Sequence, residues 1–315
     1  MKEKLELYAR ALEDSGQYKV LRRFDWPQQY AGDYTPDRQV RKGVFLDVET
    51  TGIDWNREEL IELAMVPFEY TDDGRVYRVG EAFEGLRDPG RKLSRFVKTL
   101  TGLTDEQLAG QTIDPDEVAA FLEGTSLLVA HNAAFDRPFF EKTFPGLPAL
   151  PWACSIRDVP WRELGVESSK LEYLAYKNGI FFDGHRAQID CRVGIHLLAT
   201  DWVGAGSTPL AILLQECART EARLWATGSP FKAKDRLKER GYRFDGRGKV
   251  WYRDLDSAEL ENEKVFLARE VYGEMLQRSP RIAVEVSYIT ARERYGSNAQ
   301  GQRSKVWIER ETVNS

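Results

Sequence analysis

The sequence predicts two folded regions: an α/β domain with a mixed sheet flanked by helices over residues 43–200, and a smaller α+β module over residues 206–300. In the first region, strand patterns come first and then alternate with helical patterns, which is typical of a mixed sheet with helices on its faces. Gly204, Gly206 and Ser207 mark the boundary. At 315 residues, of which 42% are hydrophobic, the chain is long enough to bury two cores.

Residues 1–42 are expected to form a helix and then an irregular extension that carries no visible chemistry. Leu5, Tyr8 and Leu12 recur at spacings of three and four residues, which predicts an amphipathic helix. Ser15-Gly16 ends that helix.

The elements of the α/β domain follow in order. Apolar runs predict its strands, and the turn at 71–74 joins two of them as a hairpin. Asp114-Pro115 interrupts a helical stretch, because proline is tolerated only in the first turn of a helix. The predicted strands are residues 43–49, 59–69, 75–84 and 126–130, and the predicted helices are residues 105–122, about 136–143, 169–178 and 187–199.

The C-terminal module has a pattern of its own. Residues 219–253 carry eleven Lys or Arg against four acids, a local charge of +7 in a chain of net charge −5, which makes the module a candidate polyanion-binding face. The polar residues 301–315 are expected to form a flexible tail. The predicted helices are residues 209–218, 231–240 and 257–277, and the predicted strands are residues 221–226, the hairpin 241–253, and residues 281–289.

Composition argues against several classes of protein. No run approaches the roughly 18 apolar residues of a transmembrane helix, and the charged start of the chain lacks the apolar region of a signal peptide, so a cytoplasmic location is expected. Cys154, Cys191 and Cys217 are widely spaced and form no C-x-x-C pair. Neither a disulfide framework nor a zinc site is therefore indicated.

Asp47 and Glu49 stand out within the apolar run 44–52. Side chains alternate between the faces of a strand, so these two carboxylates point the same way while Leu46 and Val48 point into the core. Two like charges near a protein surface repel by about 4 kcal/mol at contact distance, so a cation is expected beside them. Oxygen-only ligands suit Mg2+ or Mn2+. Taken alone, the pair also fits an ordinary solvated or salt-bridged strand end.

Two later segments supply further polar candidates. Asp136 follows the buried strand that ends at His131, at the edge where open α/β sheets bind ligands, and Pro138 predicts that its helix begins close to Asp136. In isolation this acid fits an ordinary helix N-terminus better. His185 and Asp190 are five residues apart, about 500° around a helix, so both reach one site only if His185 lies in the preceding loop. A solvent-exposed helix cap is the alternative for that histidine.

The three segments together resemble the exonuclease motifs of the DEDDh, or DnaQ-like, 3'-5' exonuclease family, which includes the epsilon proofreading subunit of bacterial DNA polymerase III. The resemblance covers about residues 43–200 and implies a ribonuclease H-like mixed sheet. Thr101 stands where the family commonly has His, a departure that touches no catalytic position. The motifs are Asp47-x-Glu49, His131-Asn132-x-x-Phe135-Asp136 and His185-x4-Asp190.

The resemblance implies a metal-dependent hydrolysis that releases 5'-mononucleotides from the 3' end of single-stranded DNA, in repair or proofreading. It implies that Asp47, Glu49, Asp136 and Asp190 hold two divalent ions, Mg2+ or Mn2+, and that His185 takes the proton from the attacking water. By the same resemblance, other residues are candidates to hold the terminal nucleotide or to shape its pocket. These candidates are Thr50, Gly52, Ile53, His131, Asn132 and Phe135.

Alternatives stay open at this point. The motifs do not distinguish sugars, so an RNA or short-oligonucleotide exonuclease remains a second hypothesis. A nucleic-acid-binding or polymerase-accessory protein is a third, against which the filled catalytic positions argue. The cations and aromatic residues of 219–253 suggest further contacts to a single strand, or equally a solvated amphipathic face.

Overall fold

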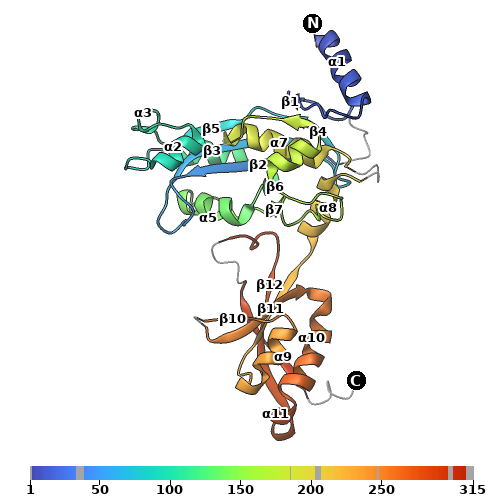
Figure 1. The fold of residues 1–315 in the computed structure, drawn as a ribbon. Coiled ribbons are helices and arrows are strands. Elements are labelled where there is room, and N and C mark those ends of the chain that lie inside the picture. Colours follow the sequence, from blue (N-terminus) through green and yellow to red (C-terminus); the bar gives the residue numbers. More distant parts are fainter. Residues whose placement is uncertain are drawn as a thin grey trace. The chain divides into compact units, whose positions relative to one another are not determined.

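The computed structural model describes residues 2–32, 39–184, 186–202, 207–246, 248–296 and 301–309. The chain divides into two compact units, Met1–Cys217 and Ala218–Ser315. Both units mix helices and strands, as the sequence predicts (Figure 1).

A mixed sheet forms the centre of the first unit. Among the described residues it has the strand order β4-β3-β2-β6-β7, with β5 also paired to β3. The pairs β2–β3, β3–β4 and β3–β5 are antiparallel, whereas β2–β6 and β6–β7 are parallel. The strands are β2 (Arg41–Thr50), β3 (Leu60–Tyr70), β4 (Val76–Val79), β5 (Phe83–Leu86), β6 (Thr125–Ala130) and β7 (Trp152–Cys154), and the short β1 (Arg22–Arg23) pairs with β8 (Ile180–Phe181).

Helices cover both faces of this sheet. Helix α7 contacts β2 and β3 on one side, and α5 contacts β2, β6 and β7 on the other (Figure 1). Residues 187–199 form α7 as predicted. The helices are α1 (Lys2–Asp14), α2 (Arg95–Thr101), α3 (Asp105–Leu108), α4 (Pro115–Leu122), α5 (Ala133–Thr143), α6 (Leu171–Lys177), α7 (Ala187–Ala199) and α8 (Pro209–Ala218).

The N-terminal extension is attached to the first unit by polar contacts. Arg22 is held by two carboxylates of α1, at 2.9 Å from Glu6 and 3.1 Å from Glu13. The Tyr30 hydroxyl lies 3.2 Å from Nδ1 of His196 in α7. The extension therefore contacts α7 through Tyr30.

Helix α5 begins earlier than the proline rule indicates. It starts at Ala133 and contains Pro138 in its second turn. Asn132 adopts the left-handed conformation (φ 98°), and its carbonyl accepts from the N–H of Phe135 at 2.7 Å, so the first turn closes before Asp136. A proline at the sixth helical position removes only one main-chain hydrogen bond, which the surrounding packing offsets.

The boundary between the units lies later than residue 206. Helix α8 belongs to the first unit, where Leu210 and Leu213 are fully buried in the core. The Thr208 hydroxyl donates to the carbonyl of Gly74 at 2.7 Å, and a Cβ on Gly74 would overlap Ala211. Close packing against the β3–β4 turn, which the sequence pattern does not reveal, therefore assigns this helix to the first unit.

The second unit is an antiparallel sheet with helices over one face. Its described strands have the order β10-β11-β9-β12-β13. Helices α9 (Lys234–Glu239), α10 (Leu260–Phe266) and α11 (Gly273–Arg278) bury a core against them, centred on residues such as Leu224, Leu267 and Val286. The strands are β9 (Glu221–Ala226), β10 (Arg243–Asp245), β11 (Val250–Asp256), β12 (Arg281–Ile289) and β13 (Arg303–Glu309).

The prediction that residues 301–315 form a flexible tail is wrong for residues 303–309. Residues 303–309 form β13 and pair with β12 along its length. Val306 and Ile308 alternate with Lys305 and Trp307, the period-two pattern of a half-buried strand.

The helices in the described part of the chain are all too short or too polar to cross a membrane.

Candidate active site

The carboxyl end of β2 places Asp47 and Glu49 on one face of the sheet. Phe45, on the same face, is fully buried against α7, where a Cβ on Gly194 would overlap its ring. The ladder with β3 runs in register up to Glu49 and then shifts between Glu49 and Thr50. Glu49 therefore forms the last pair before the register shift, with Asp47 two residues earlier on the same strand.

Helix α7 brings Asp190 to these acids. Because Gly194 lacks a side chain, the helix approaches β2 closely, and Asp190 lies one turn earlier on the same helix face. The main-chain N–H of Arg186, the N-cap residue, donates to Asp190 Oδ2 at 3.0 Å. The helix start thus fixes the orientation of this carboxylate.

Asp136 reaches the same site from α5. Its side chain is only 2% exposed, and Oδ1 accepts from the Val48 N–H at 3.2 Å. The left-handed conformation of Asn132 turns the chain sharply from β6 into α5. Asparagine is among the few residues that adopt this conformation readily, and such backbone positions gather at functional sites.

A cavity of about 290 Å3 collects these side chains. Its lining includes all four carboxylates that the sequence nominated, Asp47, Glu49, Asp136 and Asp190. It also includes the three predicted pocket residues His131, Asn132 and Phe135.

The remaining predicted site residues lie elsewhere or outside the described chain. Thr50 is the last residue of β2, Gly52 and Ile53 lie in the loop that follows it, and none of the three lines the cavity. The Thr50 hydroxyl donates to the Gly52 carbonyl at 2.7 Å, and Ile53 is 88% exposed. His185 lies outside the described residues.

The carboxylates raise one another's pKa. Burial raises the pKa of Glu49 to about 8, and the charges of Asp190 and Glu62 add to the shift. Burial and the surrounding acids likewise raise the pKa of Asp47 well above its usual range. Burial raises the pKa of Asp136 as well, against the opposing effect of the Val48 N–H. The site therefore holds more negative charge than its protein surroundings neutralise.

This donor set fits a divalent metal ion. Only carboxylate oxygens are offered, which suits Mg2+ or Mn2+, and a cation would relieve the repulsion that raises the pKa values. Among the described residues, no three His, Cys, Asp or Glu side chains already form a metal-binding cluster.

Glu62 is a fifth acid that the sequence analysis gave no role. It lies directly opposite Glu49 in the β2–β3 ladder and is 3% exposed. Its Oε2 has no hydrogen-bond partner in the described part of the chain, and Oε1 lies 3.8 Å from the Arg186 guanidinium. Its position as the single acid inside the apolar run 60–66 is the sequence signal that could have indicated a role for it.

His131 is suited to a neutral role. Burial lowers its pKa to about 4, and Nδ1 lies 2.7 Å from the Ser155 hydroxyl. It is therefore uncharged at neutral pH and can shape the cavity or exchange hydrogen bonds there without adding charge.

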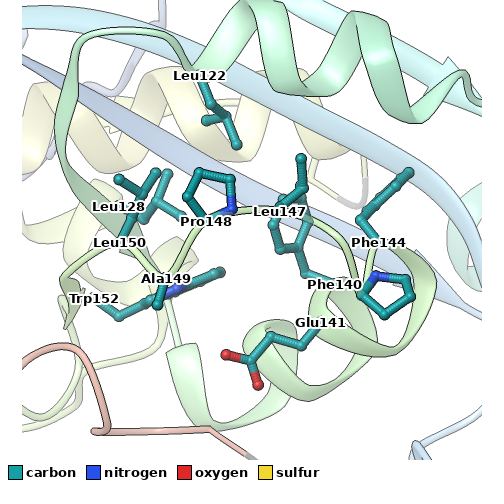
Figure 2. A pocket seen from close by; sticks show the side chains of 11 residues that line it. Leu122, Leu128, Phe140, Glu141, Phe144, Leu147, Pro148, Ala149, Leu150 and Trp152 are labelled. Atoms are coloured by element: carbon teal, nitrogen blue, oxygen red, sulfur yellow. The ribbon is translucent and has the colours of Figure 1, made fainter.

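A separate apolar cavity of about 250 Å3 lies beside α5 (Figure 2). Figure 2 shows rings and aliphatic side chains around it, among them Phe140 and Trp152. Glu141 is the one charged residue among its lining residues. This cavity lacks the groups that hydrolysis of a phosphodiester needs.

The basic segment 219–253 is less open than its sequence indicates. Trp225 is 1% exposed and Tyr242 is also buried, so neither presents a free face for stacking, whereas Phe231 is 83% exposed. Several of its cations are paired with acids of the same unit, for example Arg223 with Asp254. Part of the charge pattern therefore serves the fold of the unit.

Comparison with known proteins identifies the first unit. The family described as RNase T, exonuclease, matches residues 44–198. Two proteins named DNA polymerase III PolC-type are similar: that of Staphylococcus haemolyticus is 32% identical over 165 residues, and that of Thermotoga petrophila is 33% identical over 157 residues. The matches cover 50% and 48% of this chain but only 11% of each relative.

A solved structure described as Exonuclease X in complex with 5' overhanging duplex DNA is also similar. Its TM-score is 0.37 and its identity is 20%, and the match covers 55% of this chain and 90% of that chain. By the match to the family model, residues 44–198 form an exonuclease domain of the RNase T, or DnaQ-like, family.

Proposed function

We propose that this protein is a metal-dependent 3'-5' exonuclease that removes 5'-mononucleotides from the 3' end of single-stranded DNA. The observation that carries the proposal is the convergence of Asp47, Glu49, Asp136 and Asp190 on one cavity. The causes of the raised pKa values of the first three include no basic side chain among the described residues. Divalent metal ions are typical of the family, and these carboxylates suit two of them.

Each residue has a proposed role in the hydrolysis. Asp47, Glu49, Asp136 and Asp190 would hold the ions, which when bound would activate a water and neutralise charge at the leaving oxygen. His185 is proposed to take the proton of that water. The water oxygen bonds to phosphorus, the P–O3' bond breaks, and the departing O3' takes up a proton. The products are a 5'-mononucleotide and a strand shortened by one residue with a free 3'-hydroxyl.

The loop after β2 is proposed to hold the terminal nucleotide. Ile53 offers an exposed apolar side chain to a base or sugar, and the hydrogen bond between Thr50 and Gly52 fixes the turn that carries it. A Cβ on Gly52 would overlap the Glu58 side chain, so a substitution there would displace the loop. His131, Asn132 and Phe135, which line the cavity, are proposed to shape the pocket around that nucleotide.

DNA is the favoured substrate because the similar region belongs to proteins named as DNA polymerases. A role in repair or proofreading is proposed on the same ground. Additional contacts from the second unit are proposed to involve its exposed cations and Phe231 rather than its buried aromatic residues. Association with a polymerase is left open by these observations.

Product analysis tests the proposal. Single-stranded DNA and RNA oligonucleotides, labelled at either the 3' or the 5' end, are incubated with the protein in Mg2+, Mn2+ or EDTA. The 3'-labelled DNA should release labelled mononucleotide at once, and the 5'-labelled DNA should give a ladder of shortening products, in either metal but not in EDTA. Endonucleolytic fragments, or activity that persists in EDTA, would contradict the proposal.

A further inference from the structure

A second cavity of about 540 Å3 adjoins the carboxylate cavity. Its lining comes entirely from the segment 156–170, between β7 and α6. The two cavities share two lining residues, Ile156 and Lys170. They are therefore neighbouring spaces separated by a narrow common wall.

The second cavity has the size and lining of a nucleoside site. Its volume falls within the range of small-molecule pockets, roughly 300 to 1,000 Å3. The half-buried Ile156 and Pro160 give it an apolar surface against which a base or sugar can pack. Val159, Trp161 and Val166 also line it but are only 2–3% exposed. Glu167, at its rim, is already engaged by the Tyr173 hydroxyl and by Lys177.

Lys170 provides a cation on the common wall. No ion pair of its ammonium group is found among the described residues, and its side chain is exposed. Its main-chain N–H is held by the Ser168 hydroxyl at 3.3 Å, which fixes the backbone while leaving the ammonium free to move. A free cation beside four carboxylates is suited to an anion that the carboxylates themselves would repel.

We propose that the second cavity binds the nucleoside on the 5' side of the scissile phosphate, and that Lys170 contacts that phosphate where the two cavities meet. This inference rests on the proposed exonuclease function and extends it to a second subsite. In that arrangement the terminal nucleotide lies towards the loop after β2. The preceding nucleoside lies on the far side of the carboxylates, against the 156–170 segment.

Two substrates separate the subsite from the chemistry. The p-nitrophenyl ester of thymidine 5'-monophosphate keeps the terminal nucleoside and the scissile phosphodiester but replaces the preceding nucleoside with a small leaving group. A single-stranded oligonucleotide of thymidylates has both nucleosides. The values of kcat/KM for the two substrates are compared in Mn2+ for each variant.

Ser169→Trp fills the second cavity, which Ser169 lines. We expect kcat/KM to fall about ten-fold more for the oligonucleotide than for the ester, as the loss of one buried packing site predicts. Ser15→Trp, at an exposed position at the end of α1, is the matched control and should shift the ratio by less than about two-fold.

Lys170→Ala removes a contact that both substrates share. We expect kcat/KM to fall about ten-fold for both, with Lys170→Arg restoring most of it and Lys4→Ala, on α1, changing neither. Circular dichroism confirms that each variant folds. Equal losses on both substrates for Ser169→Trp, or no loss for Lys170→Ala, would overturn the inference. Failure of the wild-type protein on both substrates would instead overturn the proposed function, and the inference with it.

Discussion

Buried acids have opposite surroundings in the two units. Glu263 in the second unit is 2% exposed and is paired with Arg240, at 3.1 Å, and with Arg253. Asp136 in the first unit is equally buried, but the charged groups around it are carboxylates. The second unit thus neutralises its buried acid, and the first unit concentrates several.

The contrast separates structural charge from functional charge. Removing one partner of a buried ion pair lowers the stability of the protein, so an acid paired with two arginines has a structural role. Asp47, Glu49 and Asp136 have surroundings that raise their pKa values, so their ionised forms weaken the fold unless a ligand supplies positive charge. Each of the following predictions tests this distinction between structural and functional acids.

Asp136→Asn should have the largest effect on activity. It removes a proposed metal ligand, so kcat on a DNA oligonucleotide should fall by about 10³-fold, or roughly 4 kcal/mol. The free energy of unfolding of the metal-free protein should not fall, because the substitution removes like-charge repulsion. Steady-state kinetics and urea denaturation measure the two quantities.

Asp72→Asn, at an exposed position in the same unit, is the control and should leave kcat within about two-fold. Wild-type activity in folded Asp136→Asn would show that Asp136 is not needed as a metal ligand.

Glu263→Ala should show the opposite pattern. The unfolding free energy of the second unit should fall by about 1 to 3 kcal/mol, because the partly exposed Arg240 and Arg253 lose the carboxylate that both of them contact. Hydrolysis of the p-nitrophenyl ester should stay within about two-fold of wild type at a temperature where the protein is folded. Calorimetry and ester kinetics check the prediction, and a loss of ester hydrolysis without a loss of stability would erase the contrast.

Metal binding should release protons at neutral pH. The pKa of Glu49 is raised from 4.5 to about 8, so in the metal-free protein it is mostly protonated at pH 7, and a bound ion requires its carboxylate form. Glu49 should contribute about one released proton per protein at pH 7 and far less at pH 9. Titration calorimetry with Mn2+ in buffers of different ionisation enthalpy measures this number.

The same shift has a definite sign for stability. Between about pH 4.5 and 8 the folded protein binds more protons at Glu49 than the unfolded chain does, so the unfolding free energy of the metal-free protein falls as the pH rises. Saturating metal should abolish that fall. A stability that rises across this range in EDTA would contradict the raised pKa.

Glu62→Gln should have the smallest effect. Glu62 faces Glu49 and attracts Arg186, whose N–H orients Asp190, so its loss should lower kcat by about three- to ten-fold. The unfolding free energy should be unchanged or higher, since a buried charge is removed. If Glu62 acts through Arg186, then Arg186→Gln and the double variant should match Glu62→Gln, whereas additive losses would show an independent role.

Most of the residues that the sequence nominated for the site line one cavity, and part of that pattern is a local signal. Asp47 and Glu49 sit two residues apart on one strand, so the period of a strand already places them together. Asp136 and Asp190 were assigned through motif order, and both line the same cavity as the strand acids. The division into a mixed α/β domain and a smaller module is confirmed for the same reason, since hydrophobic periodicity is a local signal.

Contacts between distant segments were beyond the sequence. The role expected for Glu62 depends on its pairing with Glu49 in the sheet. The role proposed for Lys170 depends on two cavities that both include this residue in their lining. Neither residue belongs to a motif. The burial of Trp225 depends likewise on neighbouring strands, for which the basic and aromatic composition of its segment gives no signal.

The close contact between Gly74 and α8 has a practical consequence for dissecting this protein. A fragment that ends at residue 206 would lack Leu210 and Leu213 and would expose the apolar surface that they cover, which favours aggregation. Cutting after Cys217 keeps that surface closed and leaves β9 whole for the second fragment. Whether the exonuclease domain can be produced without the second unit thus depends on keeping the ten-residue helix α8 with it.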